Sequence, residues 1–288
     1  MADGTRKVRV IALGGTIAMA AAGGALKPAL GAGELAGSLG GGGMGLAVDW
    51  ADFAQVPSAN LTFADMVNLA AEISRLAHVG YHGVVISQGT DSLEETAFAL
   101  ELLLDAPIDV ALTGAMRGST AAGADGPANL LGALRFLEGS AGGGEVVVVM
   151  DDSVHAARIV SKSHTTALSA FTSGEAGPRG RIHEGRFRPL NPARAPLPKV
   201  LLPESADTPQ VELVTITLDQ SPWVLRAPGH ERVAGWVIAA MGAGHVPAAL
   251  VPDLERIARR VPVVLASRTG GGSVCTSTYG YPGAEIDL

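Results

Sequence analysis

Four residues of this sequence carry groups that could together cut a small polar molecule: Thr16, Thr90, Asp91 and Lys162. The two threonines and the aspartate stand in glycine-rich turns that follow apolar runs. A threonine hydroxyl is a weak nucleophile at neutral pH and needs a base or a positive charge beside it. A lysine can be that base when burial favours its neutral form. Backbone N–H groups in the glycine-rich turns could form an oxyanion hole, so the set predicts acyl transfer.

The elements that would position these residues are short strands buried on both faces. Compact runs of Val, Ile and Leu are typical of parallel strands, and they occupy residues 8–13, 84–87, 110–113 and 146–150. Helical patterns lie between them at residues 62–77, 93–104 and 128–137. This alternation predicts an α/β fold with an open, mostly parallel sheet. Ligands of such sheets bind beyond the carboxyl ends of the strands, so we expect the polar turns to meet at one edge.

A change in composition divides the chain. Six prolines fall between Pro189 and Pro209, where few apolar residues recur, and a βα pattern resumes after them. We therefore predict a large N-terminal α/β domain at residues 1–190, a linker at 191–210 and a smaller α/β domain at 211–288.

The overall composition argues against several classes of protein. The 288 residues carry a net charge of −7, and no basic cluster suits nucleic acid or an anionic membrane. No run approaches the roughly 18 apolar residues of a membrane helix. No secretory signal opens the chain, and the single cysteine, Cys275, cannot form an internal disulfide. We expect a cytoplasmic protein without nucleic-acid or membrane partners.

Several polar residues suit structural roles better than chemical ones. Ser92 and Glu95 have the spacing of a capping box, and Glu94 and Glu95 suit the first turn of a helix better than an acid/base pair. The histidines show no metal-binding spacing, so we expect no metal and no cofactor. A nucleotide site at Gly14-Gly15 is disfavoured because no Lys-Ser/Thr pair follows.

Four motifs, in this order, resemble those of the bacterial-type L-asparaginase family. They are 13–18 (LGGTIA), 88–96 (QGTDSLEET), 113–117 (TGAMR) continued by 124–130 (ADGPANL), and 161–163 (SKS) with 170–173 (AFTS). The resemblance covers roughly residues 8–280, and four ordered motifs are far more specific than any one alone.

The resemblance implies L-asparagine hydrolysis through an acyl-threonine intermediate, without a cofactor. Thr16 would be the first nucleophile, and Thr90 a second hydroxyl paired with Lys162. Asp91 would hold the α-ammonium group of the substrate and Ser58 its α-carboxylate. The substrate would also meet the backbone at Gly89 and Ala115; these two join Ser58, Thr90 and Asp91 as expected binding residues. The family further implies a homo-oligomer, a dimer or a tetramer.

The sequence also departs from the family pattern. No tyrosine occupies the loop around residues 26–30, where the family has one that activates the first threonine. Gln88 stands where a histidine is usual, and His245 replaces an asparagine. The chain stops at Leu288, short of the family's final helix, from which we expect weak tetramers or aggregation. These departures keep two alternatives open: a glutaminase or other side-chain amidohydrolase of this fold, and a feeble or inactive amino-acid-binding homologue.

Overall fold

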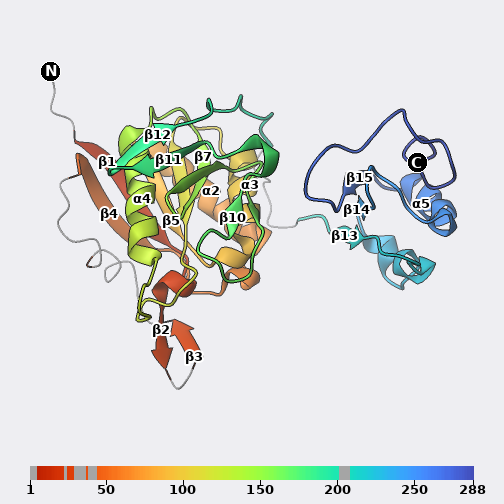
Figure 1. The fold of residues 1–288 in the computed structure, drawn as a ribbon, viewed down its shortest axis with the longest axis horizontal. Coiled ribbons are helices and arrows are strands. Elements are labelled where there is room, and N and C mark those ends of the chain that lie inside the picture. Colours follow the sequence, from red (N-terminus) through yellow and green to blue (C-terminus); the bar gives the residue numbers. More distant parts are fainter. Residues whose placement is uncertain (1–4, 23–24, 29–36, 38–43, 201–207) are drawn as a thin grey trace. The chain divides into compact units, whose positions relative to one another are not determined.

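The computed structural model describes residues 5–22, 25–28, 37, 44–200 and 208–288 (Figure 1). The chain forms two compact units, Met1–Ala206 and Asp207–Leu288. Both are α/β, and the predicted fold class is confirmed. Part of the predicted linker lies along the first unit, because Val200 N donates to Leu102 O at 2.9 Å. Residues 201–207 lie outside the described residues, so the linker at 191–210 stays a prediction.

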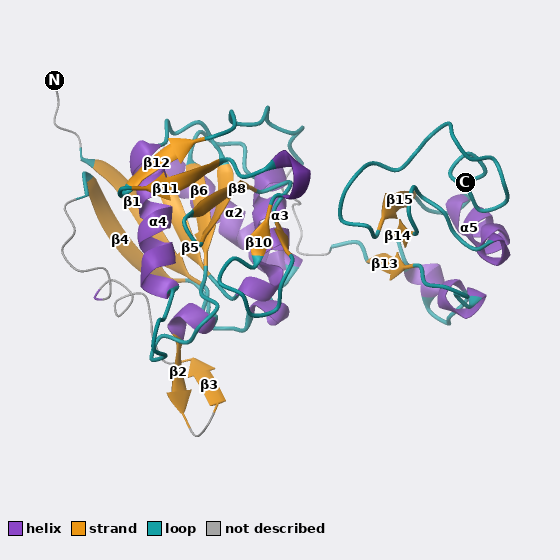
Figure 2. Ribbon diagram, viewed as in Figure 1, coloured by secondary structure: helices purple, strands orange, loops and turns teal. Residues whose placement is uncertain are grey.

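The first unit is built on an eight-stranded sheet with the order β12-β11-β8-β7-β6-β5-β1-β4 (Figure 2). Neighbours from β4 to β7 are parallel, whereas β7, β8, β11 and β12 pair antiparallel. The strands are β1 (Arg6–Ala12), β4 (Leu46–Asp52), β5 (Gly83–Ser87), β6 (Asp109–Thr113), β7 (Val146–Met150), β8 (Ser153–Ala156), β11 (Gly180–His183) and β12 (Arg186–Pro189). The four predicted strands are therefore β1, β5, β6 and β7.

Helices cover both faces of this sheet. They are α2 (Phe63–His78), α3 (Leu93–Leu103) and α4 (Gly126–Gly139). Because successive strand residues point to opposite faces, Ile11 joins the core formed with α2 and α3, while Val10 joins the core formed with α4. Each of the three buried strands β5, β6 and β7 is covered on both sides, which explains their continuous apolar sequences.

The starts of α2 and α3 differ. Thr62 and Asp65 form a capping box, in which Thr62 Oγ1 accepts from Asp65 N and the Asp65 carboxylate accepts from Thr62 N at 2.8 Å. The capping box predicted for Ser92 and Glu95 is wrong. The Ser92 side chain makes no capping bond and instead donates from Oγ to Ser58 O at 2.8 Å. The hydroxyl of Ser92 thus ties two loops together.

Shorter elements complete the description. Two small antiparallel pairs join β2 (Met19–Ala22) to β3 (Ala25–Pro28) and β9 (Ser161–Lys162) to β10 (Phe171–Thr172). The 3-10 turns are η1 (Thr16–Ala18), η2 (Ser58–Asn60), η3 (Thr90–Ser92), η4 (Gly174–Ala176), η5 (Pro222–Leu225), η6 (His230–Arg232) and η7 (Ala248–Leu250).

The second unit has a parallel sheet of three strands in the order β13-β14-β15. These are β13 (Val211–Thr215), β14 (Gly235–Ala240) and β15 (Val263–Ser267), and the helix α5 (Val251–Ala258) lies between the last two in sequence. Its core gathers Trp236, Ile238 and Leu250 with Leu254 of α5. None of the helices that the structure describes in either unit has the length and apolar character needed to span a bilayer.

Candidate active site

Three polar turns leave the same edge of the large sheet. The strands β1, β5 and β6 are parallel neighbours, and Ser87 at the end of β5 is in register with Ala12 and with Thr113. The turns that begin after these residues therefore start at one level, as the sequence predicts. They contain Thr16, Thr90 and Ala115 respectively.

Glycine allows the turns after β1 and β6 to lie against the turn after β5. Gly15 has φ +85°, and a Cβ added to it would lie only 2.1 Å from Gly89 N. A Cβ on Gly114 would lie 2.7 Å from Gln88 O and 3.0 Å from Thr90 Cγ2. No side chain fits in either gap, so only glycine permits this approach. The turn that carries Thr16 consequently lies directly against the turn that carries Thr90.

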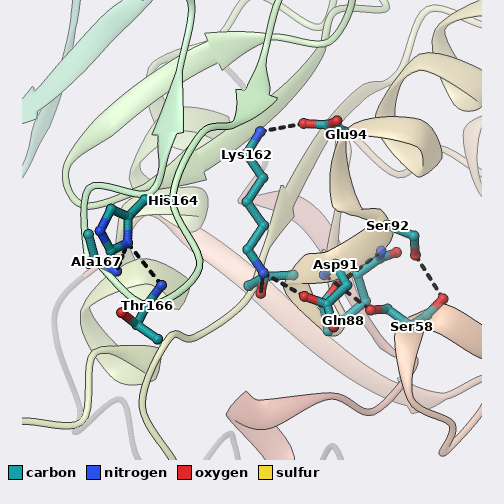
Figure 3. A network of polar contacts seen from close by, with 11 residues as sticks. Ser58, Gln88, Asp91, Ser92, Glu94, Lys162, His164, Thr166 and Ala167 are labelled. Atoms are coloured by element: carbon teal, nitrogen blue, oxygen red, sulfur yellow. Dashed lines mark hydrogen bonds and ion pairs between the residues drawn. The ribbon is translucent and has the colours of Figure 1, made fainter. Parts of the chain in front are cut away.

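Lys162 joins the Thr90 turn through its ammonium group. Lys162 Nζ donates to Thr90 Oγ1 at 2.8 Å and to Asp91 Oδ1 at 2.6 Å (Figure 3). Thr90 is 7% exposed and the lysine side chain 15% exposed, whereas the Asp91 side chain is 73% exposed. The structure thus brings together three of the four residues predicted to be catalytic, with the carboxylate on the open side.

The backbone of Lys162 is held by Glu94, which the sequence indicated only as an acidic residue in the first turn of a helix. Glu94, in the first turn of α3, accepts a hydrogen bond from the backbone N–H of Lys162 through Oε2 (Figure 3). On the other side, Lys162 pairs with Phe171 across β9 and β10. Glu94 and Lys162 are 68 positions apart, and no local pattern links them. The contact fixes the strand from which the lysine side chain projects.

Ser58 lies beneath the Thr90 turn. It is 4% exposed, and its Oγ accepts from Asp91 N at 3.2 Å. A Cβ added to Gly89 would meet Ser58 Oγ at 2.7 Å, so the serine packs tightly against that turn. Because the hydroxyl oxygen accepts the N–H, its own proton can be donated to another group. The predicted binding residues Ser58, Gly89, Thr90 and Asp91 therefore form one contiguous cluster.

The turn after β6 is fixed by two side chains of the α4 region. Asp125 accepts from Met116 N and from Arg117 N, each at 2.9 Å. Asn129 Nδ2 donates to Gly114 O at 3.0 Å and to Asp125 Oδ2 at 3.0 Å. These bonds hold Ala115, which is buried and packs in the α4 core. Asp125 and Asn129 fall within a motif found in the sequence, but their positioning role was missed.

Thr16 has fewer contacts than Thr90. It opens the 3-10 turn η1 and is half-buried. The structure gives its hydroxyl no hydrogen bond to any group that it describes. Residues 29 and 30 of the predicted tyrosine-free loop lie outside the described residues. Gly15, the residue before Thr16, lies against Gly89, and this backbone contact links Thr16 to the other predicted residues.

A cavity of about 310 Å³ opens at the charged end of the cluster. It is lined by Asp91, Lys162, Ser163, His164 and Thr165. His164 Nδ1 accepts from the backbone N–H groups of Thr166 at 3.0 Å and Ala167 at 2.9 Å (Figure 3). An imidazole nitrogen that accepts carries no proton, so the proton of the neutral ring is on Nε2. The sequence did not single out His164, which forms a wall of this cavity.

A buried histidine contacts the segment that follows β10. His155 Nδ1 is 2.8 Å from the Oγ of Ser173, the residue that follows β10. Burial, with a smaller contribution from the positive charge of Arg181, lowers the pKa of His155 to about 4. The ring is therefore neutral at physiological pH. Within the described ranges, no group of three or more His, Cys, Asp or Glu could hold a metal ion. The expectation of a metal-free site stays a prediction.

Both units match known families. Residues 7–194 match the model for the asparaginase N-terminal domain, and residues 210–287 match that for the glutaminase/asparaginase C-terminal domain. The chain is 40% identical over 240 residues to the probable L-asparaginase of Deinococcus radiodurans, covering 81% of this chain and 71% of that protein. It is 30% identical over 284 residues to the glutaminase-asparaginase of Acinetobacter glutaminasificans, covering 93% and 85%. The crystal structure of a probable cytoplasmic L-asparaginase from Campylobacter jejuni superposes with a TM-score of 0.85 at 28% identity, covering 94% of this chain and 86% of that one.

Proposed function

This chain belongs to the asparaginase/glutaminase family of amidohydrolases, and on that premise we propose that it hydrolyses L-asparagine with Thr16, Thr90, Asp91 and Lys162. The resemblance found in the sequence is confirmed at the level of the family and of the L-asparaginase type. The observation that carries the residue assignment is the 2.8 Å hydrogen bond between Lys162 Nζ and Thr90 Oγ1, made beside an exposed carboxylate.

The proposed reaction has two displacements. The Thr16 hydroxyl oxygen attacks the side-chain amide carbon, the C–N bond breaks, and the nitrogen leaves as ammonia after taking the hydroxyl proton. The resulting acyl-threonine ester is then attacked by water, whose oxygen bonds to the same carbon. The ester bond breaks, aspartate leaves and the Thr16 hydroxyl is restored. Thr90 and Lys162 relay the protons, since the two groups already share a hydrogen bond.

Substrate binding falls to the open side of the cluster. Lys162 contacts Oδ1 of Asp91, so Oδ2 can meet the α-ammonium group of the amino acid. Ser58 keeps a hydroxyl proton to donate to the α-carboxylate, because its oxygen is the acceptor for Asp91 N. The backbone at Gly89 and Ala115 lies at the edge of the sheet, where N–H groups can polarise the amide carbonyl.

The experiment that tests this function is ammonia release from L-asparagine by the purified full chain. Thr16→Ala and Lys162→Met are measured beside the parent, with Thr208→Ala, an exposed threonine outside the cluster, as a matched control. We expect activity in the parent and the control and its loss in the two variants. If the parent is as silent as the variants, the proposed hydrolysis is wrong, and calorimetry with L-asparagine then tests whether the chain binds the amino acid without cutting it.

L-Glutamine is the second candidate substrate, favoured by the likeness to a glutaminase-asparaginase. Glutamine has one more methylene than asparagine, and a single methylene changes the discrimination by about 10- to 200-fold. Relative values of kcat/KM on the two amino acids decide between them. A larger value for glutamine would reverse the proposed preference.

The proposed assembly and location follow the same likeness. We place the enzyme in the cytoplasm as a homo-oligomer, a dimer or a tetramer; the relative from Campylobacter jejuni is described as cytoplasmic. Light scattering of the full chain gives the oligomeric state directly. A monomer that releases ammonia at full rate would contradict the proposed assembly.

A further inference from the structure

The second unit contains a cavity that takes no part in the proposed reaction. Its volume is about 420 Å³, which is within the range of small-molecule sites. The inner wall is apolar and includes Leu225, Val233, Trp236 and Ile257, of which Leu225 and Trp236 are almost fully buried. The residues that line it come from η5, η6, β14, α5 and the turns that follow η5, η6 and α5. Every wall of the cavity therefore belongs to the second unit.

Three arginines surround this cavity, and two of them share a single buried carboxylate. Asp253 is 6% exposed and accepts from Arg226 Nε at 2.9 Å and from Arg256 Nη2 at 3.1 Å. The hydrogen bond from Arg226 is the main reason why the pKa of Asp253 is lowered, so the carboxylate stays charged at neutral pH. One carboxylate thus orients two guanidinium groups and neutralises one of them.

The third arginine forms no ion pair with a carboxylate in the part of the chain that the structure describes, although its charge helps to lower the pKa of Glu231. Arg260 Nη2 donates to the backbone oxygen of Glu231 at 3.3 Å. The Glu231 carboxylate, also at the cavity, accepts from Gly229 N at 3.0 Å instead. Arg256 lies in α5, and Arg260 lies in the turn that follows this helix. Counting both acids, the wall carries three positive and two negative charges, an excess of one on a chain whose net charge is −7.

An aromatic contact forms another part of the cavity wall. The His230 ring packs edge-on against Trp236, with ring centroids 4.7 Å apart and an interplanar angle of 81°. Its Nδ1 is buried and makes no hydrogen bond within the described part of the chain. Because this nitrogen is not accessible, it is not offered to a molecule in the cavity. The ring of His230 therefore contributes an aromatic surface to the wall, next to Trp236.

We propose that this cavity binds a small organic anion, a carboxylate or a phosphate that carries an apolar or flat portion. The anionic group meets the guanidinium groups of Arg256 and Arg260, which form charge-assisted hydrogen bonds. The apolar portion covers Trp236 and Ile257. A zwitterionic amino acid is a poor match because its ammonium group would face these arginines. The site is therefore separate from the one proposed for the amide substrate.

The test is calorimetry of the full chain with benzoate, phenyl phosphate and, as the uncharged match to benzoate, benzamide. Inorganic phosphate alone measures the contribution of the anionic group. We expect both aromatic anions to bind at least ten-fold more tightly than benzamide, and the tighter of the two identifies a carboxylate or a phosphate site. No measurable binding of either aromatic anion, or equal binding of benzamide, would overturn the proposal.

Two neighbouring arginines provide a matched pair of variants. Arg260→Gln should weaken anion binding at least ten-fold, and Arg260→Lys should restore part of it because the charge returns. Arg259→Gln is the control: Arg259 pairs with Glu255 on the surface and does not line this cavity. Arg260 is exposed, so its replacement leaves the fold intact, which the melting temperature verifies. Equal affinities for Arg260→Gln and Arg259→Gln would contradict the site. Ammonia release, measured separately, reports on the catalytic proposal alone.

Discussion

The two threonine turns of the first unit have the same local form and different surroundings. Each follows a parallel strand, passes through glycine and begins a short 3-10 turn, η1 at Thr16 and η3 at Thr90. The Thr90 hydroxyl is buried and bonded to Lys162. The Thr16 hydroxyl is half-buried and has no hydrogen-bond partner among the groups that the structure describes. The same sequence pattern thus gives one fixed hydroxyl and one that is held only through its backbone.

This difference indicates how the two residues could divide the work. A hydroxyl that already shares a proton with a lysine is prepared to move protons, whereas a nucleophile must approach the substrate without breaking a strong bond first. The contrast supports the proposal that Thr16 attacks and Thr90 relays. Four experiments can break or sharpen it.

The largest effect is expected from removal of either hydroxyl. Thr16→Val and Thr90→Val keep the shape of the side chain, and each should lower kcat for ammonia release by about 10²- to 10⁴-fold, the range seen when a catalytic group is lost. Only Thr90→Val removes a hydrogen bond to a charged group, so it alone should lower the free energy of unfolding, by about 1.5–3 kcal/mol. Urea denaturation measures this second effect. Equal loss of stability in both variants would remove the contrast between the turns.

The next effect comes from the contact between the two turns. Gly15→Ala and Gly80→Ala both place a side chain at a positive φ, +85° and +87°, and each carries a cost of about 1–2 kcal/mol for that conformation. Gly80 has open space around it, whereas the new methyl at Gly15 would overlap Gly89. Overpacking adds about 1–3 kcal/mol at Gly15.

Activity should separate these two glycine variants more strongly than stability does. A displacement of about 1 Å between reacting groups can lower the rate about 10²-fold, so Gly15→Ala should lose most of its ammonia release. Gly80→Ala should keep it. If Gly15→Ala retains full activity, the backbone contact does not position Thr16, and the nucleophile must be set by another group.

The sequence predicted the central strands well and the outer strands poorly, for a physical reason. Strands β5, β6 and β7 are buried on both faces and read as unbroken apolar runs. Strand β4 is one edge strand of the sheet, and its half-buried residues Leu46, Val48 and Trp50 pack against the α4 core while the residues between them are exposed. The hairpin of β11 and β12 contains arginine and histidine, because most of its residues are exposed. These outer strands lack the unbroken apolar run by which the central strands were recognised, because only one face of β4 is buried and most of the β11–β12 hairpin is exposed.

The sequence identified the main residues of the candidate site but not the residues that hold them in position. Thr90 and Asp91 follow the strand β5, which the sequence predicted, and the motif at 161–163 (SKS) indicated Lys162. The bond between Lys162 and Thr90 spans 72 positions, and that from Glu94 to Lys162 spans 68. Such contacts depend on how the β9–β10 pair meets α3, which local patterns do not encode. Glu94 was therefore interpreted as a helix charge, and the pairing of Ser92 with Ser58 was missed.

A smaller effect concerns the framework on the Lys162 side. The pKa of His155 is lowered from 6.5 to about 4 by burial and Arg181. Between these values the unfolded chain binds a proton that the folded chain does not, so the free energy of unfolding falls as pH drops from about 6.5 to about 4. This loss amounts to about 3 kcal/mol at most. His155→Gln should flatten the pH dependence of urea unfolding, whereas replacement of the exposed His183 should not. An unchanged slope in His155→Gln would show that other groups set acid stability.

The smallest effect should come from Glu94→Gln. The amide oxygen can still accept from the backbone N–H of Lys162, but the bond loses its charge, a change of about 1 kcal/mol, which corresponds to about five-fold in kcat/KM. Glu95→Gln alters the next carboxylate of the same helix turn, which has no contact to Lys162 among the described residues, and should leave kcat/KM unchanged.

Combining Glu94→Gln with Thr16→Val and with Thr90→Val then shows which threonine the Glu94 contact affects. If Glu94 acts through Lys162 on Thr90, its cost should disappear in the Thr90→Val background and persist in the Thr16→Val background. The opposite pattern would assign the lysine to Thr16 and reverse the proposed roles of the two turns.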